Sequence, residues 1–198
     1  MNYFTKINYK SALLVQAPTE DAINRQAVKD HLRVVAASQD TLLSIYIKSA
    51  TLWVENYISR KLINQTWKVF YDEFPIEIFL PFGKVSSITH LKYFDENNAQ
   101  QTLSTSLYQT DLVSVPARIS MNPDESSFPT TKSDKYNAIE IQYVTGYGAN
   151  ESDVPSDIKH AILLIVGDSF LNREDKSENL SISKASLHLL SPYRLMDF

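Results

Sequence analysis

Apolar residues near the start of the chain recur at helical spacing. After Pro18, the sequence T-E-D-A-I-N-R-Q-A-V-K-D-H-L-R places Thr19 at an N-cap. Glu20 and Asp21 then fall in the first turn, where carboxylates complement the helix dipole. The apolar stripe that follows consists of Ala22, Ile23, Ala27, Val28 and Leu32. This pattern predicts a first helix that begins directly after Pro18.

A stronger helical pattern covers residues 38–59. Ser38 can cap this helix, and Asp40 falls in its first turn. Apolar and aromatic residues recur at three- and four-residue spacings, at Leu43, Tyr46, Ile47, Ala50, Trp53, Val54 and Tyr57. We expect Trp53 to lie in the helical core, so that its replacement by alanine would cost about 3 to 5 kcal/mol.

From Trp67 the pattern changes to a period of two, which is typical of strands. The alternating stretches are W-K-V-F-Y-D-E-F, I-E-I-F-L, V-S-S-I-T-H-L-K-Y-F and I-E-I-Q-Y-V, with turn residues at Pro75, Pro81-Phe82-Gly83 and Glu96-Asn97-Asn98. They predict an antiparallel meander or a small sandwich, with Trp67 at its start. The polar segment 122–137 predicts a long loop or an exposed hairpin tip.

Helical character returns at Pro155, a residue that suits the first turn of a helix. The following I-K-H-A-I-L-L-I-V-G-D-S-F-L-N is apolar on nearly every face, which predicts a central and mostly buried helix. A polar linker at 173–185 then leads to a short terminal element, L-H-L-L-S-P-Y-R.

Together these elements predict an α+β fold. Two N-terminal helices and one buried C-terminal helix would form a small bundle, into which the antiparallel β meander or sandwich is inserted. The expected domains are a helical core of residues 1–64 plus 151–198 and a β domain of residues 65–150. The sequence V-T-G-Y-G at 144–148 falls at the corner between them, where Gly146 and Gly148 would allow positive φ and Tyr147 could lie across the corner.

Membrane segments are not expected. The longest purely apolar run, residues 161–166, is far shorter than the about twenty residues of a transmembrane helix. The N-terminal stretch has only a four-residue apolar patch and no small-residue cleavage site, so it does not resemble a signal peptide.

The charge of the chain argues against tight nucleic-acid binding. Its net charge is −4, and basic and acidic residues number eight and five in residues 1–64, six and ten in 65–150, and five and eight in 151–198. Sequence-independent DNA binding depends on many lysines and arginines that displace counterions from phosphate. The composition is compatible with a protein that only lets DNA pass.

Side chains that could carry chemistry are scattered along the chain. There is no cysteine, and none of the four histidines, His31, His90, His160 and His188, falls in a metal-binding pattern. Adjacent carboxylates occur at Asp72-Glu73, Asp95-Glu96 and Asp124-Glu125. A glycosidase-like pair would have to come from different strands. We therefore expect no catalytic residue, no cofactor and no metal ligand.

The order of the motifs resembles a known family. The stretches V-K-D-H-L-R-V, W-V-E-N-Y-I-S-R-K-L-I-N-Q-T-W, Y-D-E-F-P, V-T-G-Y-G, V-P-S-D-I-K-H-A-I-L-L-I-V-G and L-L-S-P-Y-R follow one another over roughly residues 13 to 194. In this order they are similar to the head-tail connector proteins of tailed double-stranded DNA phages and prophages.

The resemblance implies a structural adaptor rather than an enzyme. Such a protein would form a homo-oligomeric ring below the portal protein, contact a tail or stopper protein, and let DNA pass through the channel. It would reside in the virion neck, after assembly in the host cytoplasm, without contact with a membrane. The alternatives are a tail-completion or other neck protein and, less favoured, a carbohydrate-binding or hydrolytic β domain.

The terminal element is the candidate oligomer interface. Its residues for this role are Leu187, Leu190, Pro192, Tyr193 and Arg194. After a polar linker, this element could reach a neighbouring subunit or fold back on its own domain. If it is an arm, deletion from Leu187 onward should weaken assembly and leave the fold intact.

Overall fold

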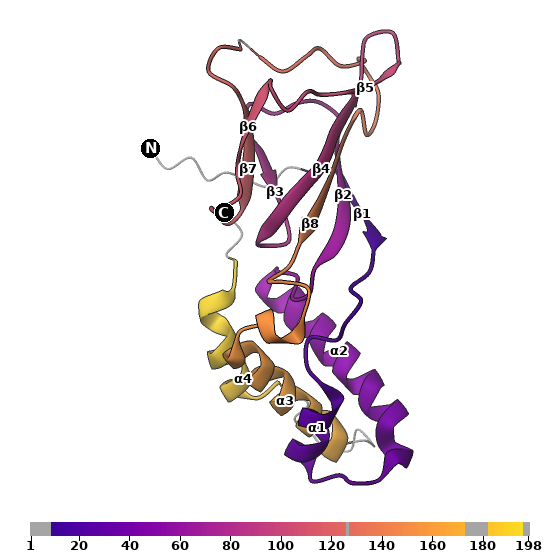
Figure 1. Ribbon diagram of the computed structural model, residues 1–198, viewed down its shortest axis with the longest axis vertical. Helices are drawn as coiled ribbons and strands as arrows, with labels where there is room; N and C mark the ends of the chain where they lie inside the picture. The colour runs from indigo at the N-terminus through magenta and orange to yellow at the C-terminus, as the bar shows by residue number, and fades with distance from the viewer. Residues whose placement is uncertain (1–8, 126, 173–181, 196–198) are drawn as a thin grey trace. The chain divides into compact units, whose positions relative to one another are not determined.

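The computed structural model describes residues 9–125, 127–172 and 182–195. The chain is an α+β protein, as predicted, and it divides into two compact units whose elements are labelled in Figure 1. The β unit contains the described residues up to Ala17 together with Asn64–Gly146. The helical unit contains Pro18–Ile63 and the described residues of Tyr147–Leu195.

The β unit consists of two antiparallel sheets. The larger sheet has the strand order β1 (Ser11–Gln16), β2 (Gln65–Tyr71), β8 (Ile139–Thr145), β4 (Val85–Phe94) and β5 (Gln100–Thr102). The smaller sheet has the order β3 (Ile78–Leu80), β7 (Ala117–Met121) and β6 (Tyr108–Asp111). Because β8 lies between β2 and β4, the strands do not follow one another as a meander.

Side chains from both sheets share one core. Alternate residues of β8 are buried, as the period of a strand requires, and Ile141 lies opposite Val69 of β2. Ile78 of β3 and Ile119 of β7 are fully buried in the same cluster. The two sheets therefore form a small sandwich, which is one of the two predicted architectures.

Strand β1 is an edge strand that the hydrophobic pattern did not predict. Ser11 lies opposite Phe70 and Leu14 opposite Trp67 of β2, so the segment before the helices completes the larger sheet. Leu13, Leu14 and Val15 are all exposed. Since three consecutive apolar residues show no period of two, the alternation that identified the other strands is missing here.

Two tyrosines of the β core give a testable pH dependence. The hydroxyl of Tyr71 donates to the carbonyl oxygen of Phe79 at 3.0 Å, and that of Tyr143 donates to Pro81 at 3.1 Å. Burial raises the pKa of both tyrosines above the ordinary value of 10. The folded state therefore holds these protons more tightly than the unfolded state. Their contribution to stability is complete below about pH 10 and is lost as the pH rises above it.

We expect alkaline titration to resolve two classes of tyrosine. Tyrosines outside the core should ionise while the protein is still folded, whereas the buried Tyr71 and Tyr143 should ionise only as the protein unfolds. Absorbance of tyrosinate, followed in parallel with circular dichroism, measures both events. The variant Tyr143→Phe removes one titrating hydroxyl and serves as the control. If all tyrosines ionised together before unfolding, the buried environment of these two hydroxyls would be wrong.

The first helix begins later than predicted. Helix α1 spans Arg25–Leu32, and its N-cap is Asn24, whose side chain accepts the N–H of Gln26 at 2.7 Å. Ala22 and Ile23 precede the helix and are buried in the helical core. The prediction of Thr19 as N-cap is wrong, because tertiary packing of these two side chains holds the segment before Asn24 out of the helix.

Helix α2 (Asp40–Ile58) closely follows its predicted range. Asp40 lies in the first turn, where Lys29 donates to it at 2.8 Å, and this hydrogen bond lowers the pKa of the Asp40 carboxyl. Ser38 does not cap the helix and instead lies in a 3-10 turn, η1 (Ala37–Gln39). The helix ends at Ile58, and its C-cap Ser59 adopts the left-handed conformation with φ 56°.

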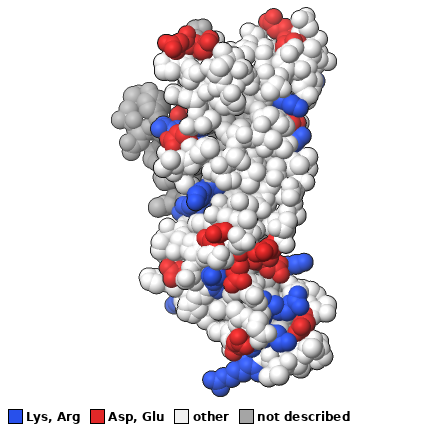
Figure 2. Space-filling view, viewed as in Figure 1, with Lys and Arg blue, Asp and Glu red and all other residues white. Residues whose placement is uncertain are grey.

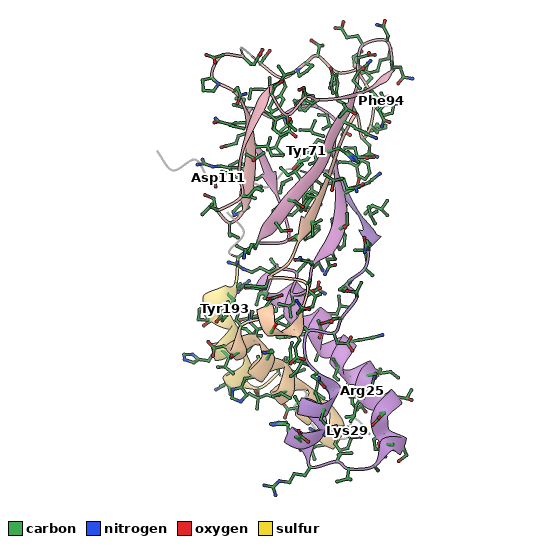
Figure 3. The ribbon with its side chains drawn as sticks, in the orientation of Figure 1. Arg25, Lys29, Tyr71, Phe94, Asp111 and Tyr193 are labelled. Carbon is green, nitrogen blue, oxygen red and sulfur yellow. The ribbon has the colours of Figure 1, made fainter. Side chains whose placement is uncertain are left out.

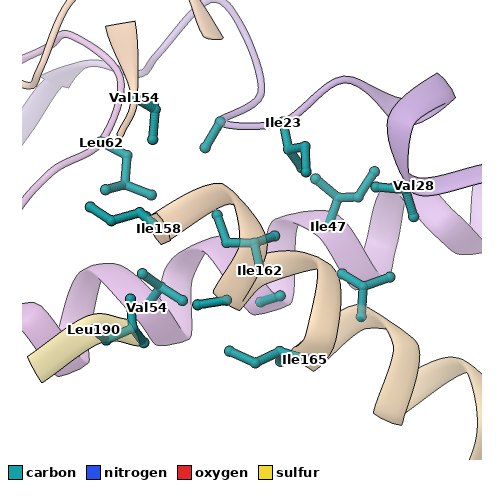
Figure 4. Close-up of a cluster of buried hydrophobic side chains, with 14 of the residues drawn as sticks. Ile23, Val28, Ile47, Val54, Leu62, Val154, Ile158, Ile162, Ile165 and Leu190 are labelled. Carbon is teal, nitrogen blue, oxygen red and sulfur yellow. The ribbon is translucent and has the colours of Figure 1, made fainter. Parts of the chain in front are cut away.

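Helix α3 (Ser156–Leu171) forms where a helix was predicted and follows the short turn η2 (Glu151–Asp153). It is buried on one face only, so the prediction of a mostly buried helix is wrong. Figure 4 shows its side chains Ile158, Ile162 and Ile165 among those of α2 and the segments before α1 and α3. Pro155 occupies the N-cap position, one residue before the helix. The polar linker expected at 173–185 lies largely outside the described residues.

The V-T-G-Y-G corner differs from its prediction at one glycine. Strand β8 ends at Thr145, and Gly146 has the expected positive φ, 150°. Gly148 does not have positive φ; it is required for space, because a Cβ there would collide with the side chain of Asp153. Tyr147 packs against the core of the helical unit.

Both tryptophans have structural positions. Trp53 stacks on Tyr57 with ring centroids 5.1 Å apart, but both rings are only half-buried against the helical core. The cost expected for Trp53→Ala should therefore fall below that of a fully buried aromatic residue. Trp67 lies in β2, as predicted, where its indole N–H donates to the Gln65 side chain at 3.0 Å.

Candidate assembly surfaces

The terminal element is a short helix followed by a 3-10 turn, α4 (Lys184–Leu190) and η3 (Ser191–Tyr193). Ser183 caps α4 by accepting the N–H of Ser186 at 3.1 Å. Helix α4 packs against α3, and Leu190 is fully buried in the core of the helical unit, where Figure 4 shows it close to Val54. The element is therefore folded onto its own helical unit.

Polar contacts hold the turn after α4 in place. Arg60 donates from Nε to the carbonyl oxygen of Tyr193 at 2.6 Å, and the Tyr193 hydroxyl donates to Asp157 at 3.2 Å. Partial burial and the negative charge of Asp157 raise the pKa of Tyr193. Figure 3 labels Tyr193 at the end of this element. The guanidinium of Arg194 lies over the ring of Tyr57, 5.4 Å from its centroid.

The five predicted interface residues therefore lie in different environments. Leu190 is buried, Leu187 and Tyr193 are half-buried, and Pro192 and Arg194 are exposed. Deletion from Leu187 onward would remove the buried Leu190 from the core, so we now expect this deletion to destabilise the helical unit. Only part of the element is free to meet another protein.

The histidines do not form a site. His31, His160 and His188 are exposed, and His160 lies on a part of α3 that is not buried. His90 lies 2.8 Å from Glu140, which also pairs with Lys68 at 2.9 Å. Although burial raises it, the pKa of Glu140 is held below its ordinary value by hydrogen bonds from His90 and Lys68. This cluster joins three adjacent strands of the larger sheet.

A small open hollow of about 150 Å³ is lined by Lys10, Tyr71, Asp72, Glu73 and Pro75. Its two carboxylates are adjacent in sequence, and Asp72 accepts the N–H of Asn137 at 2.7 Å. This hollow does not bring together carboxylates from two different strands, which a hydrolytic site would need. The described residues include no group of His, Asp and Glu able to hold a metal ion.

Surface charges of opposite sign lie beside one another. On the face drawn in Figure 2, the helical unit carries basic and acidic side chains next to each other. In the β unit, Arg118 donates to Asp111 at 3.0 Å. Hydrogen bonds from Ser114 and Arg118 lower the pKa of the Asp111 carboxyl.

None of the described helices has the length and apolar character of a bilayer span.

Three large apolar side chains on the helices remain exposed. Ile45 and Leu52 of α2 are 58% and 55% exposed, and Leu171 at the end of α3 is 78% exposed. None of the three was predicted as a surface candidate from the sequence. The signal was present, because Ile45 and Leu52 are apolar residues seven apart that lie outside the buried stripe of α2.

The sequence profile of the phage gp6-like head-tail connector proteins matches residues 26–194. The chain belongs to this family. The match includes both helices before the sandwich, the sandwich from β2 onward, and the terminal element. The family predicted from the motif order is thereby confirmed, and the chain is a structural head-tail connector.

Solved structures with the fold of this connector come from gene transfer agent (GTA) particles. One, described as the neck of an empty GTA particle computed with C6 symmetry, is 19% identical, with a TM-score of 0.78 over 94% of this chain and 96% of that chain. A second, described as the virion of the native GTA particle, is 20% identical, with a TM-score of 0.78 over 93% of this chain and 95% of that chain. A third, the neck of the native particle computed with C12 symmetry, is 19% identical, with a TM-score of 0.74 over 94% of this chain and 96% of that chain. A comparison with curated proteins finds no match.

Proposed function

We propose that this connector forms a closed ring of identical subunits in the neck of a phage or prophage particle, directly below the portal. The ring assembles in the host cytoplasm, joins the head to a tail or stopper protein, and leaves a channel for DNA. It acts without catalysis and without a cofactor. Membership of the connector family carries this proposal.

A ring is supported by the fold that the connector shares with chains of symmetric neck structures. Identical subunits close into a ring when each presents two different complementary surfaces to its neighbours. The helical unit and the β unit can both carry such surfaces.

The terminal element is proposed to contribute one of these surfaces. Leu190 anchors it to its own helical unit, which leaves Leu187, Pro192, Tyr193 and Arg194 to face a neighbouring subunit or the portal. A fixed, partly apolar turn presents contacts with little loss of conformational entropy on binding.

Passage of DNA agrees with the charge of the chain. A strongly basic channel would retain DNA through its phosphates, whereas a net charge of −4 with interspersed signs gives little such retention.

Light scattering coupled to size exclusion tests the ring. The full chain is measured over a wide range of concentration, alone and with its cognate portal protein. We expect one large, discrete species in at least one condition, and co-elution with the portal. A strict monomer in both conditions would contradict the proposal. Co-elution with a tail protein but not with the portal would instead identify a tail-completion protein.

A further inference from the structure

One strip on the outer side of α2 combines two apolar residues with a positive charge. Ile45 and Leu52 are exposed, and Lys48 lies between them on the same face of the helix. The buried stripe of α2, which includes Ile47 and Val54, points away from this strip. The α2 strip, defined as Ile45, Lys48 and Leu52, is therefore not used by the core of its own subunit.

A second strip, on α3, has the same arrangement with the opposite charge. Leu171 is exposed, Leu164 is half-buried, and the exposed Asp168 lies between them. These three residues share one face of α3, which differs from the face that carries Ile158, Ile162 and Ile165 into the core. We call Leu164, Asp168 and Leu171 the α3 strip.

The two strips match when one helix is reversed. Along α2, the charge follows the first apolar residue by three positions and precedes the second by four. Along α3, the charge follows the first apolar residue by four positions and precedes the second by three. An antiparallel arrangement of the two helices therefore pairs Ile45 with Leu171, Lys48 with Asp168 and Leu52 with Leu164. Each strip extends for about 10 Å along its helix. Neither Lys48 nor Asp168 has an ion-pair partner within the described part of the chain.

We propose that the α2 strip of one copy packs against the α3 strip of the next copy in the ring. This inference rests on the proposed ring and names its subunit contact. The strips differ and are complementary in charge, as a head-to-tail contact between identical subunits requires. In Figure 1, α2 and α3 run in opposite directions. Rotation about the ring axis does not change the direction of a helix along that axis. Where α2 and α3 lie along the axis, α2 of one copy therefore meets α3 of the next copy in antiparallel orientation.

Cysteine cross-linking tests this contact without interference, because the chain contains no cysteine. A double variant, Lys48→Cys with Asp168→Cys, is assembled under the conditions that give the ring and is mildly oxidised or treated with a short bismaleimide. We expect a ladder of covalent multimers on a denaturing, non-reducing gel. Equal mixtures of the two single variants should give only covalent dimers, and neither single variant alone should cross-link.

The matched control is Lys48→Cys with His160→Cys. His160 is also exposed on α3, but it lies eight residues, or about 12 Å, from Asp168 along the helix. This control should assemble and give no ladder. The proposed contact is overturned if the ring forms without cross-links between positions 48 and 168, or if the control cross-links equally well. Neither of these results contradicts the ring itself. A chain that stays monomeric, alone and with the portal, and forms no cross-link overturns both.

Discussion

Replacing Leu190 by alanine is expected to lower the free energy of unfolding by about 2 to 5 kcal/mol, the range for removing a large aliphatic side chain from a core. Leu190 is fully buried in the helical unit, although it lies near the end of the chain in an element that its sequence marks as a candidate interface. The lost contacts with α2 and α3 leave a cavity that the short terminal element can fill only by shifting.

Urea denaturation, followed by circular dichroism, measures this effect. The matched control is Arg194→Ala in the same element, which removes an exposed side chain that lies over the ring of Tyr57. Its expected cost is at most about 1 kcal/mol, since exposed cation–π contacts are weak. If Leu190→Ala and Arg194→Ala had equally small effects, the terminal element would not be part of the core. It would then be a free arm, as one of the two predictions from the sequence has it.

Glu55→Ala should destabilise the helical unit by about 3 to 5 kcal/mol, the range for removing one partner of a buried ion pair. Glu55 is almost buried in the last turn of α2. One carboxylate oxygen accepts the N–H of Leu62 at 2.9 Å, and the other accepts from Lys61 at 3.0 Å. Without this carboxylate, the N–H of Leu62 and the ammonium of Lys61 lose this acceptor, and the turn between Ser59 and Leu62 is held less firmly.

The variant Glu55→Gln separates the two interactions. Its amide oxygen can still accept the N–H of Leu62, so we expect a smaller loss than for Glu55→Ala. Thermal and urea unfolding of both variants give the comparison. If Glu55→Ala lowered the free energy of unfolding by less than about 1 kcal/mol, this carboxylate would not stabilise the turn after α2.

Much of the architecture could be predicted because burial is periodic. In α2 and β8, the spacing of apolar residues alone gives the type of element and its buried face. The start of α1 could not be predicted in this way. Thr19 and Asn24 are both acceptable N-caps, and the choice between them depends on the burial of Ala22 and Ile23 against helices distant in sequence.

Short strands were missed for a related reason. β5 (Gln100–Thr102) contains only exposed polar residues and is a strand because β4 is beside it. The terminal element shows the same limit. Its sequence fits an arm and a docked tail equally well, and the buried position of Leu190 decides that the described residues are docked.

The path of the chain between the two units restricts how the connector can be divided. Strand β1 precedes the first two helices, whereas its partner β2 follows them, and the chain returns to the helical unit after β8. Neither unit is thus a continuous piece of sequence. A fragment that began at residue 64 would lack β1 and leave the backbone of β2 open along a sheet edge that could pair with other chains. Fragments made by proteolysis and fusions to a tag should therefore retain β1 together with β2.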